Sequence, residues 1–369
     1  MPVTMKDIAM LIGISRQAVA AALEGNGGSR VSPETREKVL KLAHELNYIP
    51  NAAARSLKGG TTKTIGILAS PGTPYSDAVF AEICQILRSH GYSYLAADLI
   101  PQISELPQVC QALASRGVDG MIVIGASKTP PKYLMPDIPI VFCRTICGLS
   151  DIDIDKEQTG YLGTSHLLEH GHEAVSYLGI HHQGINLRER GWQRALHTHG
   201  AKGTRIDLHT LKGSAEQLEK ILRKEKVTAL FCSNDFLAAK VTRYLSRRGW
   251  KIPDDIALVG CDGNSFIEYT TPSISTVIQP LHPLAEQCVE LILNRVKNRI
   301  CGVILERINI APRLWTGGSC GCPEHPFDLL FRLNCTGTLE KDYRLNFNIS
   351  LWDETGRKIT KTPNRGDSQ

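Results

Sequence analysis

The spacing of hydrophobic residues divides the chain into three regions with different periods. Residues 4–47 repeat apolar positions at helical intervals, and from Ile65 short apolar runs alternate with amphipathic segments of helix length. After about Ser319, apolar and polar residues alternate in "FDLLFRLNCTG" and "YRLNFNISLWDETGRKI". These periods predict an α/β chain with an all-α N-terminal domain, a core of parallel βαβ sheets and a short β-rich C-terminal extension.

Three short helices are expected in the N-terminal region, each with its own start signal. "TMKDIAMLIG" has Thr4 as a candidate N-cap and Gly13 as a stop, and "SRQAVAAALEG" begins after Ser15. "SPETREKVLKLAHELNY" combines Ser32 as N-cap with Pro33 at the first helical position. Joined by "IGIS", the first two helices form a helix-turn-helix if both pack on the third, and a plain three-helix bundle is the alternative.

The second of these helices begins with side chains that suit a DNA recognition helix. In a helix-turn-helix, the first residues of the second helix meet the base edges of the major groove. Here they are Arg16, Gln17 and Ala18. Arginine can pair bidentately with guanine and glutamine with adenine, while alanine offers a methyl contact to thymine.

The core pattern contains seven apolar runs of strand length. They are "TIGILAS", "YSYLAAD", "GMIVIG", "IPIVFCR", "AVSYLGI", "TALFCSN" and "DIALVGCD". Most are separated by helix-length segments such as "DAVFAEICQILRSHG" and "SAEQLEKILRKEK". About 250 residues of this pattern predict two similar lobes rather than one sheet.

A segment with the composition of a linker separates the N-terminal helical region from the βα region. "PNAAARSLKGG" is too short to form a stable isolated helix in water, so a flexible linker is one interpretation of it. We expect a DNA-binding domain at residues 1–49 and a hinge and linker at residues 50–63. A two-lobed core is expected at residues 64–318, followed by an extension of unassigned role at residues 319–369.

Composition and charge limit the possible function classes. Apolar residues make up 42% and charged residues 21%, as in globular proteins, and the net charge is +5. Residues 1–60 hold eight Lys/Arg against five Asp/Glu, which suits either a phosphate-facing or a solvated surface. No apolar run reaches 18 residues, and Lys6 and Asp7 interrupt any signal-peptide core. We therefore expect a cytoplasmic protein with no membrane partner.

The eleven cysteines favour buried thiols over a disulfide framework. Their number is odd, and Cys84, Cys143, Cys232, Cys261 and Cys288 each lie singly inside an apolar pattern. Such cysteines are typical of a reducing cytoplasm.

Polar side chains follow several of the predicted strands. Ligands of doubly wound sheets bind outside the carboxyl ends of the strands, so these residues predict a binding crevice. They are Ser70, Ser127, Arg144, Asn234, Asp235 and Asp262. Acidic, amide and guanidinium groups suit a polyhydroxylated ligand. Tyr75, Trp192 and Phe236 are candidate wall residues, with core packing as the alternative for each.

Three further sequence patterns could suggest metal binding, and each is incomplete or has a structural alternative. "DIDIDKEQTGYL" lacks the glycine and the final glutamate of a calcium loop. The spacing of His166, His170 and His172 could suit a metal ion, but a structural helix end is the favoured interpretation. Cys320-x-Cys322 lacks zinc-knuckle spacing and is a weak signal for metal or redox chemistry. No nucleophile–base arrangement or phosphate loop is found. We expect no enzyme activity, no metal and no cofactor.

The motifs "KDIA", "VSPETREKV", "LNYIPN" and "ARSL" stand in order at the spacing of the lactose repressor (LacI/GalR) family, which the chain resembles over roughly residues 4–315. "LRERGW", "ALFCSND" and "IPDDIALVGCD" continue the resemblance. It implies a helix-turn-helix headpiece, a periplasmic-binding-protein-like core, a homodimer on palindromic operator DNA and control by a small-molecule effector.

The resemblance also implies site residues. Leu57 matches a leucine that enters the minor groove from a hinge helix formed on the operator, and Arg188 matches a ligand-contacting arginine. The DNA-binding candidates are Thr4, Arg16, Gln17, Ala18, Arg30, Asn51, Ala54, Arg55 and Leu57. The effector-binding candidates are Ser70, Tyr75, Ser127, Arg144, Arg188, Trp192, Asn234, Asp235, Phe236 and Asp262.

The second predicted helix, which is the expected recognition helix, departs from the family pattern. Ala20 and Ala21 replace the usual Ser-Arg pair, Glu24 replaces an asparagine, and "GNGGSR" is longer than usual. Fewer phosphate contacts weaken non-specific DNA binding, so Arg16 and Gln17 are expected to carry more of the specificity, with Arg30 compensating in part.

These observations predict a ligand-responsive transcriptional regulator, a repressor by default, that associates with the bacterial nucleoid when it is bound to operator. A sugar or sugar derivative is the expected effector, and a purine or another metabolite is the second choice. The rival hypothesis is a sugar-binding module, or a sugar-responsive regulator, whose DNA contact is weakened.

Overall fold

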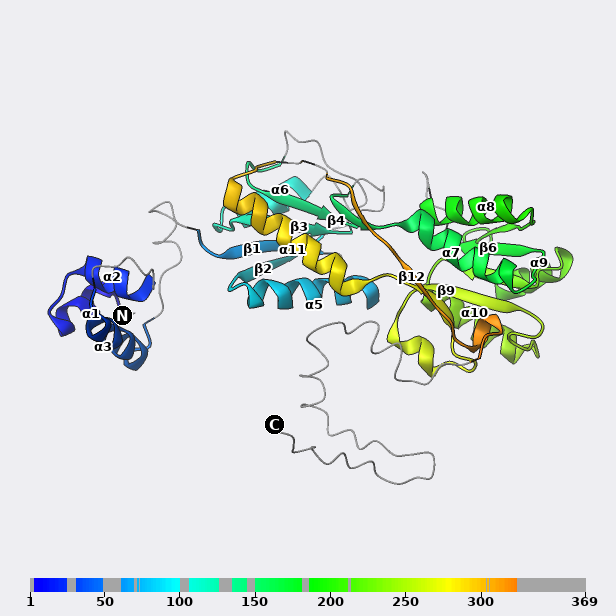
Figure 1. The fold of residues 1–369 in the computed structure, drawn as a ribbon, viewed down its shortest axis with the longest axis horizontal. Coiled ribbons are helices and arrows are strands. Elements are labelled where there is room, and N and C mark those ends of the chain that lie inside the picture. The colour runs from blue at the N-terminus through cyan, green and yellow to red at the C-terminus, as the bar shows by residue number, and fades with distance from the viewer. Residues whose placement is uncertain are drawn as a thin grey trace, which may run out of the picture. The chain divides into compact units, whose positions relative to one another are not determined.

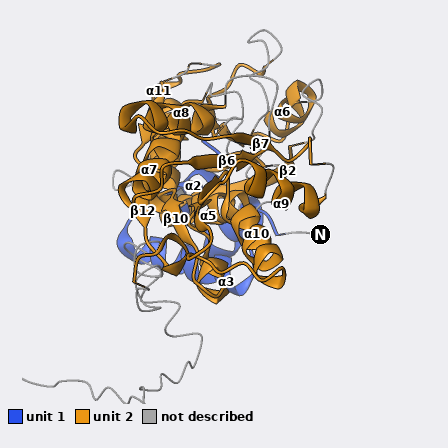
Figure 2. Cartoon of the chain, turned by 90° about the vertical axis from the view of Figure 1, so that its right-hand side faces the viewer, with its two compact units in different colours: residues 1–62 blue, residues 63–369 orange. Residues whose placement is uncertain are grey.

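The computed structural model describes residues 3–24, 31–48, 61–69, 72, 74–99, 106–125, 135–144, 150–180, 186–211, 214–302, 304 and 306–323. Two compact units are present, Met1–Thr62 and Lys63–Gln369 (Figure 2). Most of the expected C-terminal extension, residues 324–369, lies outside the described residues.

The first unit contains the three predicted helices, α1 (Met5–Ile12), α2 (Arg16–Glu24) and α3 (Pro33–Glu45). Their expected caps are confirmed. Thr4 and Asp7 form a reciprocal capping box, and Gly13 ends α1 in the left-handed conformation with a φ of 74°. The hydroxyl groups of Ser15 and Ser32 accept backbone N–H bonds at the starts of α2 and α3.

One apolar cluster holds these helices together. Ile8 of α1, Val19 and Ala22 of α2 and Val39 of α3 are completely buried. Because these positions fall on one face of each helix, the opposite face of α2 stays available to a partner.

The second unit contains two six-stranded sheets, as the βα pattern predicted (Figure 1). The first sheet has the order β11-β5-β4-β3-β1-β2 and is parallel throughout. Its strands are β1 (Thr64–Ala69), β2 (Ser93–Asp98), β3 (Gly120–Ile124), β4 (Ile140–Cys143), β5 (Ile152–Ile154) and β11 (Ile308–Ile310).

The second sheet has the order β12-β10-β9-β8-β6-β7, and β12 alone runs antiparallel to its neighbour. Its strands are β6 (Val175–Gly179), β7 (Arg205–Asp207), β8 (Ala229–Cys232), β9 (Ala257–Asp262), β10 (Ser275–Ile278) and β12 (Arg313–Trp315). The chain crosses between the sheets three times, after β5, β10 and β11, so both lobes are discontinuous in sequence.

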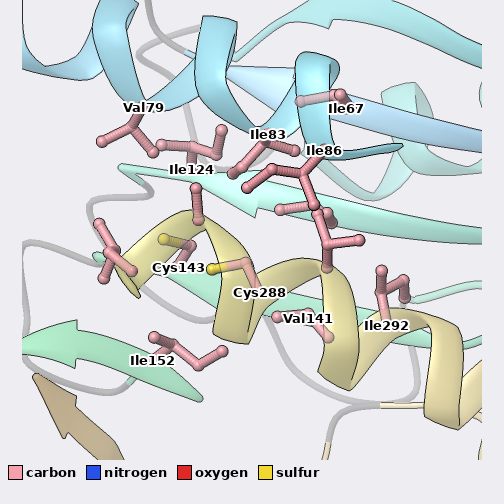
Figure 3. Packing of buried hydrophobic residues seen from close by; sticks show 14 of the residues in the cluster. Ile67, Val79, Ile83, Ile86, Ile124, Val141, Cys143, Ile152, Cys288 and Ile292 are labelled. Atoms are coloured by element: carbon pink, nitrogen blue, oxygen red, sulfur yellow. The ribbon is translucent and has the colours of Figure 1, made fainter. Parts of the chain in front are cut away.

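Helices cover both faces of each sheet. On the first lobe, α5 (Pro74–Ser89) and α11 (Leu281–Asn298) share one apolar cluster, in which the labelled sulfur atoms of Cys143 and Cys288 are visible (Figure 3). Residues of α6 (Leu106–Ala114) belong to a separate cluster with alternate residues of the same strands.

The second lobe repeats this layering. The two clusters of its core contain residues of α7 and α8 in one and of α9 and α10 in the other. These helices are α7 (Lys156–Glu169), α8 (Leu187–His199), α9 (Ala215–Lys224) and α10 (Asp235–Arg247). Short 3-10 helices, η3 (Ser265–Tyr269) and η4 (Gly318–Cys320), complete it, and residues 319–323 thus pack on the second lobe.

The five cysteines expected to be buried are buried free thiols. Among the described helices, none is both long and apolar enough to cross a bilayer.

Candidate functional site

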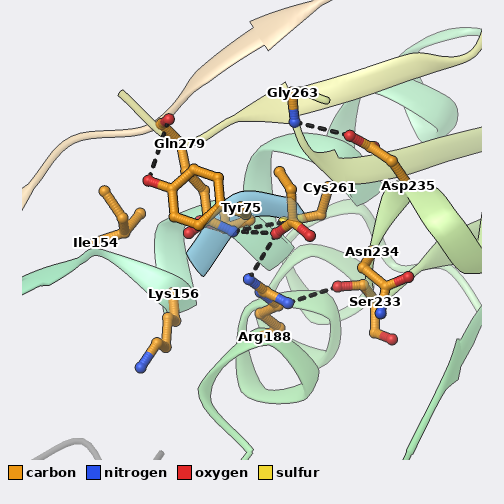
Figure 4. Close-up of polar contacts among 12 residues, drawn as sticks. Tyr75, Ile154, Lys156, Arg188, Ser233, Asn234, Asp235, Cys261, Gly263 and Gln279 are labelled. Carbon is orange, nitrogen blue, oxygen red and sulfur yellow. Dashed lines mark hydrogen bonds and ion pairs between the residues drawn. The ribbon is translucent and has the colours of Figure 1, made fainter. Parts of the chain in front are cut away.

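A half-buried ion pair lies at the carboxyl ends of the second lobe's strands. Arg188, in the first turn of α8, places its Nη2 atom 3.2 Å from the Oδ1 atom of Asp262 at the end of β9. Its Nη1 atom donates to the backbone oxygen of Ser233, 2.5 Å away, just after β8 (Figure 4). The resemblance to the repressor family and the strand-end argument therefore lead to residues that touch each other.

A third group completes this cluster from the neighbouring strand. The side-chain amide of Gln279, which follows β10, donates to Asp262 Oδ1. Burial raises the pKa of Asp262, and the positive charges of Arg188 and Arg144 offset part of that rise. Sequence reasoning missed Gln279 because the four-residue strand before it was not predicted.

The first lobe contributes Tyr75 and Arg144 to the same cluster. The hydroxyl group of Tyr75, in α5, donates to the backbone oxygen of Gln279 at 3.3 Å (Figure 4). The Cζ atom of Arg144, which follows β4, lies 4.2 Å from the centroid of the Tyr75 ring. Burial raises the pKa of the Tyr75 phenol, so it acts as a neutral donor.

Three buried polar atoms of this cluster have no hydrogen-bond partner among the described residues. They are Arg144 Nε, Arg188 Nε and Gln279 Oε1. Buried polar atoms are nearly always paired in proteins, and an exception calls for a specific explanation such as a ligand. Two donors and one acceptor are thus available to a small polar molecule. We use the name polar cluster for Tyr75, Arg144, Arg188, Asp262 and Gln279.

Asn234 and Asp235 have structural partners beside the polar cluster. Asn234 caps α10 by accepting from the Leu237 backbone N–H at 2.8 Å. Asp235 is completely buried and accepts from the backbone N–H groups of Gly263 and Asn264, both at 2.8 Å. These bonds hold the turn that follows Asp262.

The two remaining aromatic candidates differ in environment. Trp192 is 4% exposed within the apolar core of the second lobe, and its Nε1 donates to Val175 O at 2.8 Å. Its environment is therefore that of a packing residue, the alternative that sequence analysis left open. Phe236 is 55% exposed, with its ring centroid 6.3 Å from that of Phe266.

The DNA-reading candidates lie at the start of α2. The Ala18 backbone N–H is capped by Ser15, and Arg16 and Gln17 are exposed while Val19 is buried. Thr4 is exposed, with its hydroxyl donating to Asp7 at 2.7 Å. The other DNA-binding and effector-binding candidates lie outside the described residues: Arg30, Asn51, Ala54, Arg55, Leu57, Ser70 and Ser127.

Comparison with known proteins decides the family. Residues 4–51 match the model described as "Bacterial regulatory proteins, lacI family", and residues 164–320 match a periplasmic binding protein-like domain. The HTH-type transcriptional repressor PurR of Vibrio vulnificus is 32% identical over 319 residues, covering 80% of this chain and 92% of the relative. The chain belongs to the LacI family of bacterial regulatory proteins.

Other relatives and solved structures agree with this assignment. The ribose operon repressor of Haemophilus influenzae is 31% identical over 313 residues, covering 80% of this chain and 92% of that protein. The crystal structure of the lac repressor dimer bound to operator and the anti-inducer ONPF has a TM-score of 0.73 at 24% identity, covering 87% of this chain and 99% of that one. The family and its named relatives make this chain a LacI-type DNA-binding transcriptional repressor.

Proposed function

We propose that this LacI-family repressor binds palindromic operator DNA as a homodimer and is controlled by a sugar or sugar derivative bound at the polar cluster. The observation that carries the effector part is the half-buried Arg188–Asp262 pair, in a cluster where three buried polar atoms have no hydrogen-bond partner among the described residues. Partly buried charges and buried polar atoms without hydrogen-bond partners cost stability. Their position at the carboxyl ends of strands therefore favours a ligand site there.

The chemistry of the cluster suits hydroxyl groups. Asp262 accepts hydrogen bonds, the two guanidinium groups donate them, and the Gln279 carbonyl oxygen accepts one more. A sugar hydroxyl both donates and accepts, so one ring can satisfy several of these atoms together. A relative named ribose operon repressor, 31% identical over 313 residues, supports the sugar class.

The DNA part rests on the exposed start of α2. Arg16 and Gln17 present the side chains that read guanine and adenine, while Val19 and Ala22 fix the helix to its own unit. The proposed coupling passes through the hinge segment, residues 50–63. A ligand that favours one arrangement of the two lobes changes how the hinges of a dimer meet the operator.

A thermal-shift screen of mono- and disaccharides beside purine bases and nucleosides tests the effector class, because a ligand of the folded state raises the melting temperature. Operator binding is then measured with each compound that shifts the transition. Failure of every sugar to raise the melting temperature contradicts the sugar proposal, and a shift by purines alone replaces it with the purine class.

The Asp262→Asn variant tests the location of the site. Loss of a charge-assisted hydrogen bond of about 1.5–3 kcal/mol predicts sugar affinity roughly 10–100-fold weaker. Asp255→Asn is the matched control, because Asp255 is exposed and bonds only the local Lys251 backbone among the contacts of the described residues. Equal affinity in the two variants contradicts the site. Effector binding without any operator preference supports the rival binding-module function.

A further inference from the structure

Two histidines and a cysteine meet on the second lobe, apart from the residues of the polar cluster. His166 lies in the last turn of α7, and His170 is the C-cap residue of that helix. Four positions apart, they lie on one helix face, and their ring centroids are 4.5 Å apart. Cys322, more than 150 residues later in the chain, lies against both rings.

The distances from the Cys322 sulfur to the two ring nitrogens are close to those between ligands of a tetrahedral metal ion. The Sγ atom of Cys322 is 3.7 Å from His166 Nε2 and 3.3 Å from His170 Nε2. All three candidate ligand atoms lie within 4.8 Å of one another. Zinc bonds of about 2.0–2.1 Å to nitrogen and 2.3 Å to sulfur place tetrahedral ligands roughly 3.3–3.6 Å apart.

The backbone around Cys322 is held in place by buried hydrogen bonds. Ser319 donates its hydroxyl to Leu258 O at 2.7 Å and accepts from the Ser275 backbone N–H at 2.9 Å. Gly321 then adopts a φ of 93°, a left-handed turn that favours glycine, immediately before Cys322. The thiol is thus brought to α7 by a segment anchored on β9 and β10, which reduces the ordering that ligand binding requires.

We propose that His166, His170 and Cys322 bind one zinc ion on the second lobe. Two imidazole nitrogens and one thiolate form a donor set that zinc prefers, while calcium and magnesium prefer oxygen. Binding displaces the thiol proton of Cys322 to solvent, and a solvent molecule completes the fourth position. The ion links the segment after β12 to α7, so it stabilises the lobe without taking part in effector recognition.

The test uses the full-length protein, purified under reducing conditions and stripped of metal. Zinc binding is measured by competition with a chromophoric chelator, and cobalt(II) is the spectroscopic probe. We expect one zinc per chain, and a cobalt complex with a thiolate charge-transfer band and the visible bands of a tetrahedral site.

Variants separate this site from other metal-binding groups. Cys322→Ser and His170→Asn are each expected to weaken zinc binding at least about 100-fold, since even outer-shell changes cost 10–100-fold. Cys322→Ser also removes the charge-transfer band. The matched controls Cys301→Ser and His199→Asn alter a partly exposed thiol and an exposed imidazole outside this cluster, and they are expected to keep full affinity.

Circular dichroism of each metal-free variant checks that the fold is intact before affinities are compared. The absence of stoichiometric zinc binding by the unaltered protein overturns the proposal. Equal affinity in folded Cys322→Ser, or loss of binding in Cys301→Ser, overturns it as well, because the ion is then held elsewhere.

Discussion

Arg144 and Asp262 both hold positive φ angles, 52° and 121°, in a region of backbone conformation that non-glycine residues seldom adopt. Each such residue costs about 1–3 kcal/mol, and it persists where the surrounding structure requires one side-chain direction. Both residues follow a strand and both belong to the polar cluster. Their strain is thus best explained by the need to aim two charged groups at one place.

Asp235 provides a prediction about pH. Burial and the neighbouring Asp262 raise its pKa to about 8, and the Thr276 hydroxyl, which donates to Oδ1 at 2.6 Å, offsets part of that rise. The unfolded chain loses the Asp235 proton near its ordinary pKa of about 4. Between these values the folded state binds more protons, so the free energy of unfolding falls as pH rises from about 4 to about 8.

Urea unfolding of the unaltered protein and of Asp235→Asn across this pH range measures the effect. The variant is expected to show a smaller decrease, since an amide has no proton to lose. Parallel curves for the two proteins would show that Asp235 is already ionised at low pH in the folded state.

Arg16 and Gln17 provide a prediction about operator sequence. Arg16→Ala and Gln17→Ala should each cost about 1–3 kcal/mol on the preferred operator and relax the preference at one base pair. Competition binding against a set of single-base operator variants measures this. Lys41→Ala, an exposed change on α3, is the control. An unchanged sequence preference in both α2 variants would contradict the reading role of this helix.

At the scale of elements, α7 and α8 cross at two glycines. A Cβ atom on Gly191 would lie 1.9 Å from the backbone oxygen of Glu157, and one on Gly160 would lie 1.9 Å from that of Arg188. The backbones of the two helices are therefore in direct contact. This contact fixes the first turn of α8, from which the Arg188 side chain extends to its ion pair with Asp262.

Gly191→Ala should therefore lower both stability and effector affinity. Overpacking of this kind costs about 1–3 kcal/mol, and a displaced α8 moves Arg188 away from Asp262. Thermal unfolding and effector titration measure the two effects, with Thr198→Ala on the exposed face of the same helix as control. Lost stability with unchanged effector affinity would show that α8 placement does not govern the site.

A second long-range contact joins α11 to the edge of the first sheet. Arg295 is 1% exposed, and its Nη2 atom is 2.6 Å from Asp151 Oδ1, which precedes β5. It also donates to the backbone oxygens of Ile140 and Ile304. Since Asp151 is completely buried, this arginine is its main source of compensating charge among the described residues.

Arg295→Ala is expected to destabilise the protein by about 3–5 kcal/mol, because it leaves an uncompensated carboxylate in the core. Urea unfolding measures the loss, and Arg243→Ala, an exposed change on α10, should stay within about 0.5 kcal/mol of the unaltered protein. A small effect of Arg295→Ala would mean that water or another group reaches Asp151.

At the scale of the whole molecule, three chain crossings make the two lobes parts of one connected core. The polar cluster draws on both lobes, because Tyr75 bonds Gln279 across them. A ligand bound there, as we propose, would make different contacts in different lobe arrangements, and this difference would be the free energy available for control of DNA binding.

Thermodynamic linkage then makes a quantitative prediction. If an effector changes operator affinity by some factor, typically about 5–150-fold, the operator must change effector affinity by the same factor. Effector titrations with and without saturating operator DNA, and operator titrations with and without effector, measure both sides. Independent affinities in both directions would contradict allosteric control by that compound.

Several features were predictable because their signals are local. Thr4, Ser15 and Ser32 act as caps through neighbours three residues away, and seven strands follow from continuous apolar runs. The short strands β7, β10, β11 and β12 were not predicted, because each contains polar or charged residues and lacks the continuous apolar run of β4 and β8. The environment of Trp192 also could not be read from its position, since a buried aromatic and a ligand-contacting one look alike in sequence.

The sequence by itself indicated the helix-turn-helix unit, the α/β class, the two lobes and the strand-end residues Arg144 and Asp262, and the family resemblance added Arg188. Only the tertiary structure decided which distant residues touch: Gln279 with Asp262, Arg295 with Asp151, and Cys322 with His166 and His170. The reason is physical. Periodicity and capping arise from interactions within one turn or strand, whereas contacts across more than a hundred residues depend on how whole elements pack.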